Sequence, residues 1–307
     1  MDHDVQPRTR VGIIGAGRVG RALARASRRA GLDVAAAWSR TEHTRQRVAG
    51  ELAIPVATSL DEAVVGCDIV IVAVPDEQLA AVLLELAGRI DDGAAPLVVV
   101  TSGSSSIELG ESVRTAGGRV VRIHPLRAIT DVMQADALDG VVAAVTASGD
   151  ADGAAARELA TRLGMVPFEL ADADASTWHA AGSIAAGGVT TLLAAARDLA
   201  VLAGLEPDAA LRAMADLARG AIDQAVTQSP EAALTGPVVR GDAGTVAAHV
   251  AAIQARRPDL VDPYRAVARA SADLAHRSGR IDDDVLARID EAIGDGPTVD
   301  EVVTTWA

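Results

Sequence analysis

The sequence contains no lysine, so all 28 of its Lys and Arg positions are arginines. The absence of lysine excludes a Schiff-base mechanism and a lysine that acts as the catalytic acid. Only one cysteine is present, Cys67, which excludes a disulfide framework and is typical of a reducing cytosol. Cys67 lies in a strand-like segment, where we interpret it as a small core residue rather than a nucleophile.

Targeting signals and long apolar runs are also scarce. The N-terminal segment MDHDVQPRTR is polar and has no apolar signal core, which does not support secretion. The longest uncharged run, residues 180–196, has 17 residues and includes glycines, a serine and two threonines. It is short for a membrane span, and we expect a helix buried between protein surfaces. We therefore expect a cytoplasmic protein with no membrane partner.

The charge and length narrow the class of protein further. The formal charge is −14, which argues against nucleic acid or an anionic membrane as a partner. Half of the 307 residues are hydrophobic, enough for two domains with full cores. No spacing of His, Cys and Asp suggests a metal site, so none is expected.

A glycine-rich turn lies near the N-terminus. In VGIIGAGRVGRALARA, residues 11–26, a β-branched run precedes glycines in GxGxxG spacing and a helical pattern follows. The first glycine allows the tight turn, the second lets a pyrophosphate approach the backbone, and the third lets helix and strand pack closely. The turn therefore predicts a dinucleotide site. Its residues are Gly15, Ala16, Gly17, Arg18, Val19 and Gly20.

Short apolar segments alternate with helical patterns over the first half of the chain. This alternation predicts a doubly wound, mainly parallel α/β sheet of the Rossmann type, which we place at residues 1–170. Ligands of such sheets bind at the carboxyl ends of the strands. The residues expected there are Val74, Pro75, Ser102, Gly103 and His124. The further predicted strands are residues 33–38, 67–75, 96–103, 119–125, 141–148 and 166–170.

The end of the second predicted strand bears on the choice of cofactor. An NAD site usually has an acid there, whereas this chain has Ser39, Arg40 and Thr41, with Arg45 and Arg47 one turn further on. Hydroxyl and guanidinium groups suit a 2′-phosphate, so the pattern favours NADP(H) over NAD(H). The alternative is that Arg40 is a solvated loop residue.

From about residue 173 the pattern is almost entirely helical, and we place a second domain, all-α, at residues 171–307. Pro207, Pro230 and Pro258 stand at expected helix starts. The small-sided helices bury too little in a monomer, so we expect a homodimer formed by this domain.

The segment ALTGPVVRGDAGTVAAHV, residues 233–250, reads as a loop that turns into a helix with Asp242 as N-cap. The helix start, Arg240 and the hydroxyls of Thr235 and Thr245 could together bind the carboxylate of a small substrate. The alternative is that Asp242 is only a cap and Arg240 its ion-pair partner. We assign His249, one turn later, to helix packing.

Two other histidines are candidates for proton transfer. His124 ends a strand at the binding edge, and His179 begins a helix next to Trp178. A hydride that reaches a carbonyl or imine must be matched by a proton, and imidazole titrates in the right range. A structural role remains open for each of them.

The order of these motifs resembles a bacterial family of Rossmann-like proteins whose C-terminal helical domain has no assigned function. The motifs are GxGxxG, SR-T, AVPD, SG, HP, WHAAG and LTGPVVRGD…TV..H, and the resemblance covers roughly residues 10 to 275. The family is similar in architecture to pyrroline-5-carboxylate reductase, ketopantoate reductase and 6-phosphogluconate dehydrogenase. The resemblance implies a C-terminal domain of the 6-phosphogluconate dehydrogenase type and an oxidoreductase reaction.

Two functions are consistent with these patterns. The first is an NADP(H)-dependent reductase of a small oxo- or imino-carboxylate, with hydride transfer in the cleft between the domains. The second is a dinucleotide-binding sensor or scaffold without turnover. The candidate carboxylate site favours the enzyme, because a sensor needs no second anion site.

Overall fold

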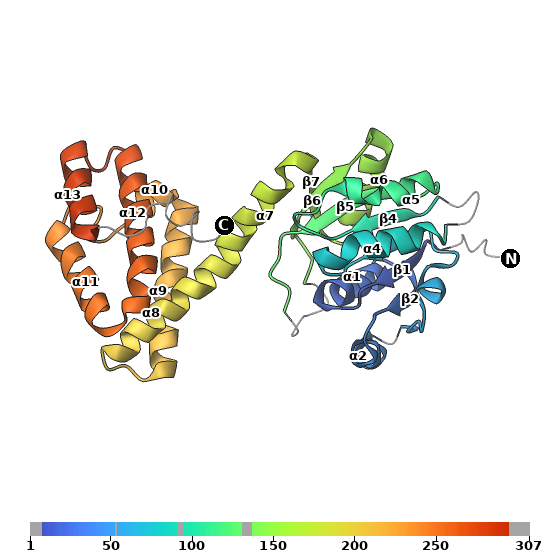
Figure 1. Ribbon diagram of the computed structural model, residues 1–307, viewed down its shortest axis with the longest axis horizontal. Helices are drawn as coiled ribbons and strands as arrows, with labels where there is room; N and C mark the ends of the chain where they lie inside the picture. Colours follow the sequence, from blue (N-terminus) through green and yellow to red (C-terminus); the bar gives the residue numbers. More distant parts are fainter. Residues whose placement is uncertain (1–7, 53, 91–94, 131–136, 295–307) are drawn as a thin grey trace. The chain divides into compact units, whose positions relative to one another are not determined.

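The computed structural model describes residues 8–52, 54–90, 95–130 and 137–294. The polar segment 1–7, in which no signal core was found, lies outside the described residues, as does the segment 295–307. The chain divides into two compact units, residues 1–185 and 186–307 (Figure 1). The first unit is an α/β domain, and the second is made of helices.

The first unit is built on one sheet, whose strand order is β2-β1-β3-β4-β5-β6-β7. All neighbouring strands are parallel except β5 and β6, which confirms the mainly parallel sheet expected from the sequence. The chain leaves β1 for β2 on one side and returns to β3 on the other, so ligands are expected at the carboxyl ends of these strands. The strands are β1 (Arg10–Ile14), β2 (Asp33–Trp38), β3 (Ile69–Val72), β4 (Leu97–Val100), β5 (Arg119–Pro125), β6 (Val142–Ala147) and β7 (Val166–Glu169).

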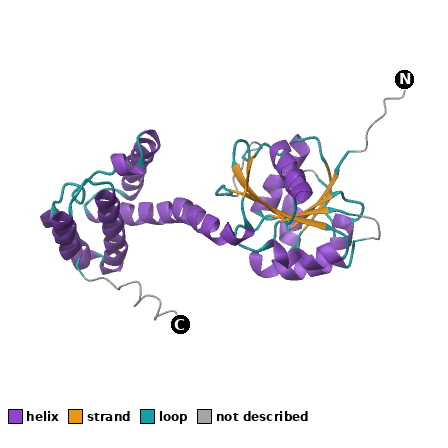
Figure 2. Cartoon of the chain, turned by 90° about the horizontal axis from the view of Figure 1, so that it is seen from above, coloured by secondary structure: helices purple, strands orange, loops and turns teal. Residues whose placement is uncertain are grey.

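Helices cover both faces of this sheet (Figure 2). Because side chains alternate along a strand, Ile69 and Ile71 pack into one apolar cluster and Val70 and Val72 into the other. The first cluster includes α1, α2 and α6, and the second includes α3, α4 and α5. Burial on both faces is why the strands are almost continuously apolar. The helices are α1 (Arg18–Arg29), α2 (Glu42–Leu52), α3 (Leu60–Val64), α4 (Asp76–Ala87), α5 (Glu111–Thr115) and α6 (Asp150–Arg162).

A long helical segment follows the sheet. It consists of α7 (Ala175–Ser183), a π-helical turn (Ile184–Gly188) and α8 (Val189–Leu202), and the boundary between the two units falls within the π-helical turn. The sequence predicts a buried helix here. That expectation is wrong for the single chain, because residues 180–196 are exposed or half-exposed. The segment 172–202 is long and apolar enough to cross a membrane, but one such helix is weak evidence for a membrane protein.

The second unit adds α9 (Pro207–Thr227), α10 (Pro230–Ala233), α11 (Ala243–Arg256), α12 (Val261–Arg277) and α13 (Asp283–Ile293). Pro207 and Pro230 each begin a helix as expected, whereas Pro258 begins a short 3₁₀ turn before α12. Ile289 and Ile293 of α13 are fully buried in the apolar core of this unit. Helix α13 is therefore part of the fold of the second unit.

Candidate functional site

The turn between β1 and α1 contains three glycines, each with its own structural reason. Gly15 has a φ of 89°, and a Cβ there would strike the carbonyl oxygen of Ala73. A Cβ on Gly20 would strike the carbonyl oxygen of Gly15, so this glycine lets α1 pack on the turn. Gly17 faces open space and is the N-cap of α1, where no side chain caps the helix. The backbone at this helix start therefore fits a pyrophosphate.

A pocket of about 470 Å³ opens beside this turn. It extends from the turn past the end of β2 to α4, so it continues from the pyrophosphate position to the place where a dinucleotide carries its ribose. Seven of the residues predicted from the sequence to bind the cofactor line it. They are Gly15, Gly17, Ser39, Arg40, Thr41, Val74 and Pro75.

The arginines after β2 have different roles. Arg45 donates a hydrogen bond to the carbonyl oxygen of Ser39 at 2.6 Å and pairs with Glu42 at 2.6 Å. Arg47 pairs with a glutamate of its own helix. Arg40 lines the pocket and is exposed, and its guanidinium makes no hydrogen bond or ion pair with any residue the structure describes. Arg40 is therefore the arginine of this group that suits a phosphate ligand.

The remaining residues of the turn contribute mainly through their position. Ala16 is buried and Val19 half-buried, and both pack into the first apolar cluster of the sheet. Their side chains help to hold α1 against the strands. Arg18 is the first residue of α1 and is exposed, so it adds positive charge at the helix start.

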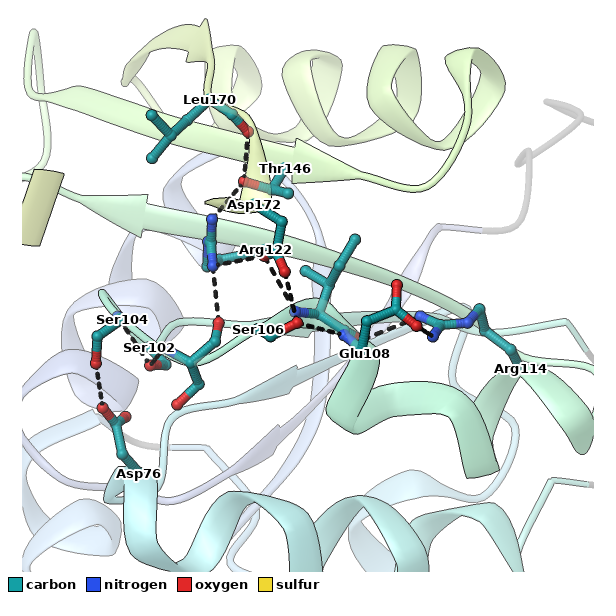
Figure 3. Close-up of polar contacts among 12 residues, drawn as sticks. Asp76, Ser102, Ser104, Ser106, Glu108, Arg114, Arg122, Thr146, Leu170 and Asp172 are labelled. Carbon is teal, nitrogen blue, oxygen red and sulfur yellow. Dashed lines mark hydrogen bonds and ion pairs between the residues drawn. The ribbon is translucent and has the colours of Figure 1, made fainter. Parts of the chain in front are cut away.

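The loop after β4 is fixed by its serines. The buried Ser102 hydroxyl accepts hydrogen bonds from the backbone N–H groups of Ser104 and Ser105, at 3.3 and 2.8 Å. The Ser104 hydroxyl donates to Asp76 at the start of α4, at 3.1 Å (Figure 3). The side chain of Ser102 thus shapes the loop that presents Gly103.

Gly103 is where the two candidate histidines meet. A Cβ on Gly103 would lie 3.0 Å from Nε2 of His124 and still closer to Nδ1 of His179. The two imidazole rings are 5.8 Å apart, centre to centre, in an edge-to-face arrangement. His124 comes from β5 and the exposed His179 from α7, so the first unit brings together residues 55 positions apart. Only glycine allows both rings to approach this loop.

His124 is held in one orientation. Its Nδ1 lies 3.0 Å from the carbonyl oxygen of Thr101, which can only accept a hydrogen bond. Burial lowers the pKa of His124 below its ordinary value of 6.5, and the neighbouring charges of His179 and Arg122 lower it further. The hydrogen bond to Thr101 and the charge of Asp76 act in the opposite direction. The ring is therefore neutral near pH 7.

This lowered pKa predicts a pH dependence of stability. In the unfolded chain His124 takes up a proton as the pH falls through 6.5, whereas in the folded protein it does so only at lower pH. Acidification therefore favours the unfolded state. We expect wild type to lose more free energy of unfolding than His124→Gln between about pH 7.5 and pH 5.5, as measured by urea denaturation. Equal losses in the two proteins would contradict a lowered pKa.

A buried arginine supports this part of the site (Figure 3). Arg122 on β5 is fully buried, and its guanidinium donates to the carbonyl oxygen of Ser105 at 2.7 Å, to Asp172 at 3.0 Å and to the Thr146 hydroxyl at 2.7 Å. Asp172 also accepts hydrogen bonds from Ser106 and from the backbone just after it. The network ties the loop that carries Gly103 to the segment that leads into α7.

Sequence reasoning missed this arginine. The signal that could have found it is a charged residue in the middle of the otherwise apolar strand RVVRIHP. Its partner Asp172 is 50 residues away in the chain, so the pair could not have been predicted from spacing.

In the second unit, Asp242 is the N-cap of α11, as expected. Its carboxylate accepts the backbone N–H of Thr245 at 3.0 Å and the Thr245 hydroxyl at 2.6 Å. These two hydrogen bonds lower the pKa of Asp242. Arg240 is exposed, and it forms no hydrogen bond or ion pair with Asp242 or any other described residue, although its positive charge also lowers the pKa of Asp242. Thr235 is also exposed.

His249 has a packing role in the second unit. Its Nδ1 lies 2.9 Å from the Tyr264 hydroxyl, and the two rings are in edge-to-face contact. Among the described residues no group of three or more His, Cys, Asp or Glu side chains could hold a metal ion.

Comparison with known proteins agrees with this architecture. The model of a Rossmann-like domain matches residues 2–125, and that of a domain of unknown function (DUF2520) matches residues 141–271. A comparison with curated proteins gave no match.

Several solved structures share the fold over most of both chains. A Bacteroides fragilis protein assigned as an NADP oxidoreductase has 22% identity and a TM-score of 0.74, covering 87% of this chain and 98% of that one. Plasmodium falciparum pyrroline carboxylate reductase, with NADP bound, has 14% identity and a TM-score of 0.56, covering 87% and 98%. The Aspergillus terreus reductive aminase, in complex with NADPH and ethyl levulinate, has 17% identity and a TM-score of 0.59, covering 93% and 99%.

At these identities the likeness shows the fold, including the similarity to pyrroline carboxylate reductase expected from the sequence. The Rossmann-like match contains strands β1 to β5, and the DUF2520 match contains β6, α6, β7 and the helices from α7 into α12. The chain thus combines a Rossmann-like domain, matched over residues 2–125, with a DUF2520 domain, matched over residues 141–271.

Proposed function

We propose that the protein is an NADP(H)-dependent oxidoreductase that reduces a small oxo- or imino-carboxylate. The observation that carries the proposal is the shared edge of the sheet in the first unit. The glycine turn follows β1, the wall of the pocket follows β3, the Gly103 loop follows β4 and His124 lies near the end of β5. Bound NADPH would supply a hydride, and the histidine pair would provide polar groups for the substrate at the same edge.

The cofactor preference tests the proposal. Arg40 lies where an acid would mark an NAD site, so we expect NADPH to bind at least tenfold more tightly than NADH, about 1.4 kcal/mol. Arg40→Asp should narrow or invert this ratio, because a carboxylate repels a 2′-phosphate and accepts a ribose hydroxyl. Fluorescence titration of both cofactors measures the ratio.

Arg47→Asp is the matched control, because Arg47 carries the same charge on α2 but does not line the pocket. It should leave the preference close to wild type. Equal affinities of the wild-type protein for NADPH and NADH would contradict the assignment of Arg40.

Arg240, in the second unit, is proposed to bind a carboxylate. The exposed guanidinium stands two residues before the N-cap of α11, so a charge-assisted hydrogen bond and the helix dipole would act on the same anion. The Asp242 carboxylate accepts hydrogen bonds from the backbone N–H and the hydroxyl of Thr245, so in this proposal the two residues fix the start of the helix.

We also propose that the second unit forms a symmetric dimer. None of the residues of α8 is buried and only Ala210 of α9 is, while Leu217 and Val226 of α9 are 70% and 82% exposed. Apolar helix surfaces of this extent are typical of an interface, and two copies of one surface can cover each other about a two-fold axis.

Light scattering at micromolar concentration should therefore give the mass of two chains. Leu217→Glu and Val226→Glu, combined in one protein, should shift the mass towards one chain because they place four carboxylates in the dimer interface. A wild-type mass of a single chain would refute the dimer. We place this assembly in the cytoplasm, as a soluble protein.

A further inference from the structure

The orientation of His124 decides which hydrogen bond it can make to a substrate. Because Nδ1 donates to the carbonyl oxygen of Thr101, the neutral ring has no proton on Nε2. Nε2 therefore presents a lone pair. It faces the Gly103 loop, and no donor to it is present among the residues that the structure describes. A ligand at this loop thus meets an acceptor.

The surroundings of the ring keep it in this state. On its own strand, two residues away, lies the fully buried cation Arg122, and the loop and α7 bring Gly103 and His179 against the ring. Asp76, at the start of α4, is the acidic group near enough to favour a proton on the ring. The effect of burial is larger than the effect of the Asp76 charge, so the pKa of His124 stays below its ordinary value.

The two substrate classes of the proposed function place opposite demands on this acceptor. A ketone oxygen becomes an alkoxide when it takes up a hydride, so it needs a donor nearby. A protonated imine already carries its proton on nitrogen and needs an acceptor that orients the N–H group. The unprotonated Nε2 can accept a hydrogen bond from the N–H group of the imine, whereas its lone pair repels the oxygen of a ketone.

We propose that the group reduced by this protein is a protonated imine, C=N–H⁺, whose N–H donates a hydrogen bond to Nε2 of His124. The inference rests on the proposed oxidoreductase function and selects between its two substrate classes. The imine carbon accepts a hydride from a reduced nicotinamide, and the π electrons of the C=N bond become the nitrogen lone pair. The cation thereby becomes a neutral amine and NADPH becomes NADP⁺, so no proton has to be supplied.

The first experiment reads the state of His124 without turnover. Nitrogen-15 NMR of the histidine rings, with His124→Gln to identify the resonance, should show a neutral ring protonated at Nδ1 near pH 7. A ring protonated at Nε2, or a cationic ring, would overturn the inference.

The second experiment compares 1-pyrroline with cyclopentanone, two five-membered rings that present C=N and C=O, and adds 1-pyrroline-5-carboxylate as a charged imine. Oxidation of NADPH should be faster with the imines. His124→Leu should lower kcat/KM for the imines by between about tenfold and a hundredfold, because a hydrogen bond to a charged group is lost. His124→Gln, whose amide oxygen can accept, should recover part of the rate.

Three outcomes then distinguish a failure of the imine inference from a failure of the proposed oxidoreductase function. His276→Gln, the same substitution at a half-exposed histidine of the second unit, should leave all rates unchanged. Faster reduction of cyclopentanone, especially if His179→Gln abolishes it, would overturn the imine and leave the oxidoreductase intact. Failure of every probe to oxidise NADPH would contradict the proposed function and with it the inference.

Discussion

Replacement of Arg122 by methionine is expected to lower the free energy of unfolding by about 3 kcal/mol. The guanidinium is fully buried, and its loss leaves the Ser105 carbonyl oxygen without this donor and the Asp172 carboxylate without its counter-ion. Breaking one side of a buried ion pair typically costs about 3–5 kcal/mol, and Asp172 is 28% exposed, so the lower end applies. Thermal unfolding should shift down by roughly 6–12 °C.

The matched control is Arg157→Met, because Arg157 forms an ion pair with Glu169 on the surface of the same unit. That change should cost less than about 1 kcal/mol. Arg122→Met combined with Asp172→Asn should be more stable than the sum of the single changes predicts, because the second change removes the carboxylate charge that the first leaves without its partner. Additive effects would indicate that the two side chains act independently.

The largest effect on cofactor binding is expected from Gly17→Val. A Cβ at Gly17 meets no protein atom within 4 Å, and the φ of −67° suits any residue. The fold should therefore tolerate valine, while the new side chain fills the space beside the uncapped helix start. NADPH affinity should fall at least a hundredfold, about 2.7 kcal/mol, with little change in the melting temperature.

Gly20→Val provides the contrast within the same turn. Its Cβ would strike the carbonyl oxygen of Gly15, so this variant should lose stability as well as affinity. If Gly17→Val bound NADPH as tightly as wild type, the pyrophosphate could not lie at the start of α1. Calorimetry and fluorescence titration on the two variants measure both effects.

Much of the first unit could be predicted from the sequence because its signals are local. The apolar strands alternate with helices, and the glycine spacing places the turn at the first of them, so both the sheet and the pocket lie where the pattern indicates. Arg40 was predicted from the missing acid at the end of β2. Asp242 was predicted from its place before a helical pattern, and it caps α11.

The rest depends on contacts between distant parts of the chain. His124 and His179 are in contact only because β5, the Gly103 loop and α7 come together in the fold. The spacing of these residues in the sequence does not predict that contact. The Arg122 network is missed for the same reason. The error on residues 180–196 has a different cause, since their apolar composition predicts burial but does not reveal whether this chain or a second copy provides it.

The contact at Gly103 also limits how the sequence can vary. Both imidazole rings occupy the space that a side chain at residue 103 would need, so any larger residue there must be accompanied by a smaller or displaced side chain at position 179 or 124. The three positions are therefore expected to change together, although they lie on a loop, a helix and a strand. Among related sequences, loss of the glycine should therefore coincide with loss of a histidine, and proteins that keep all three should share one chemistry.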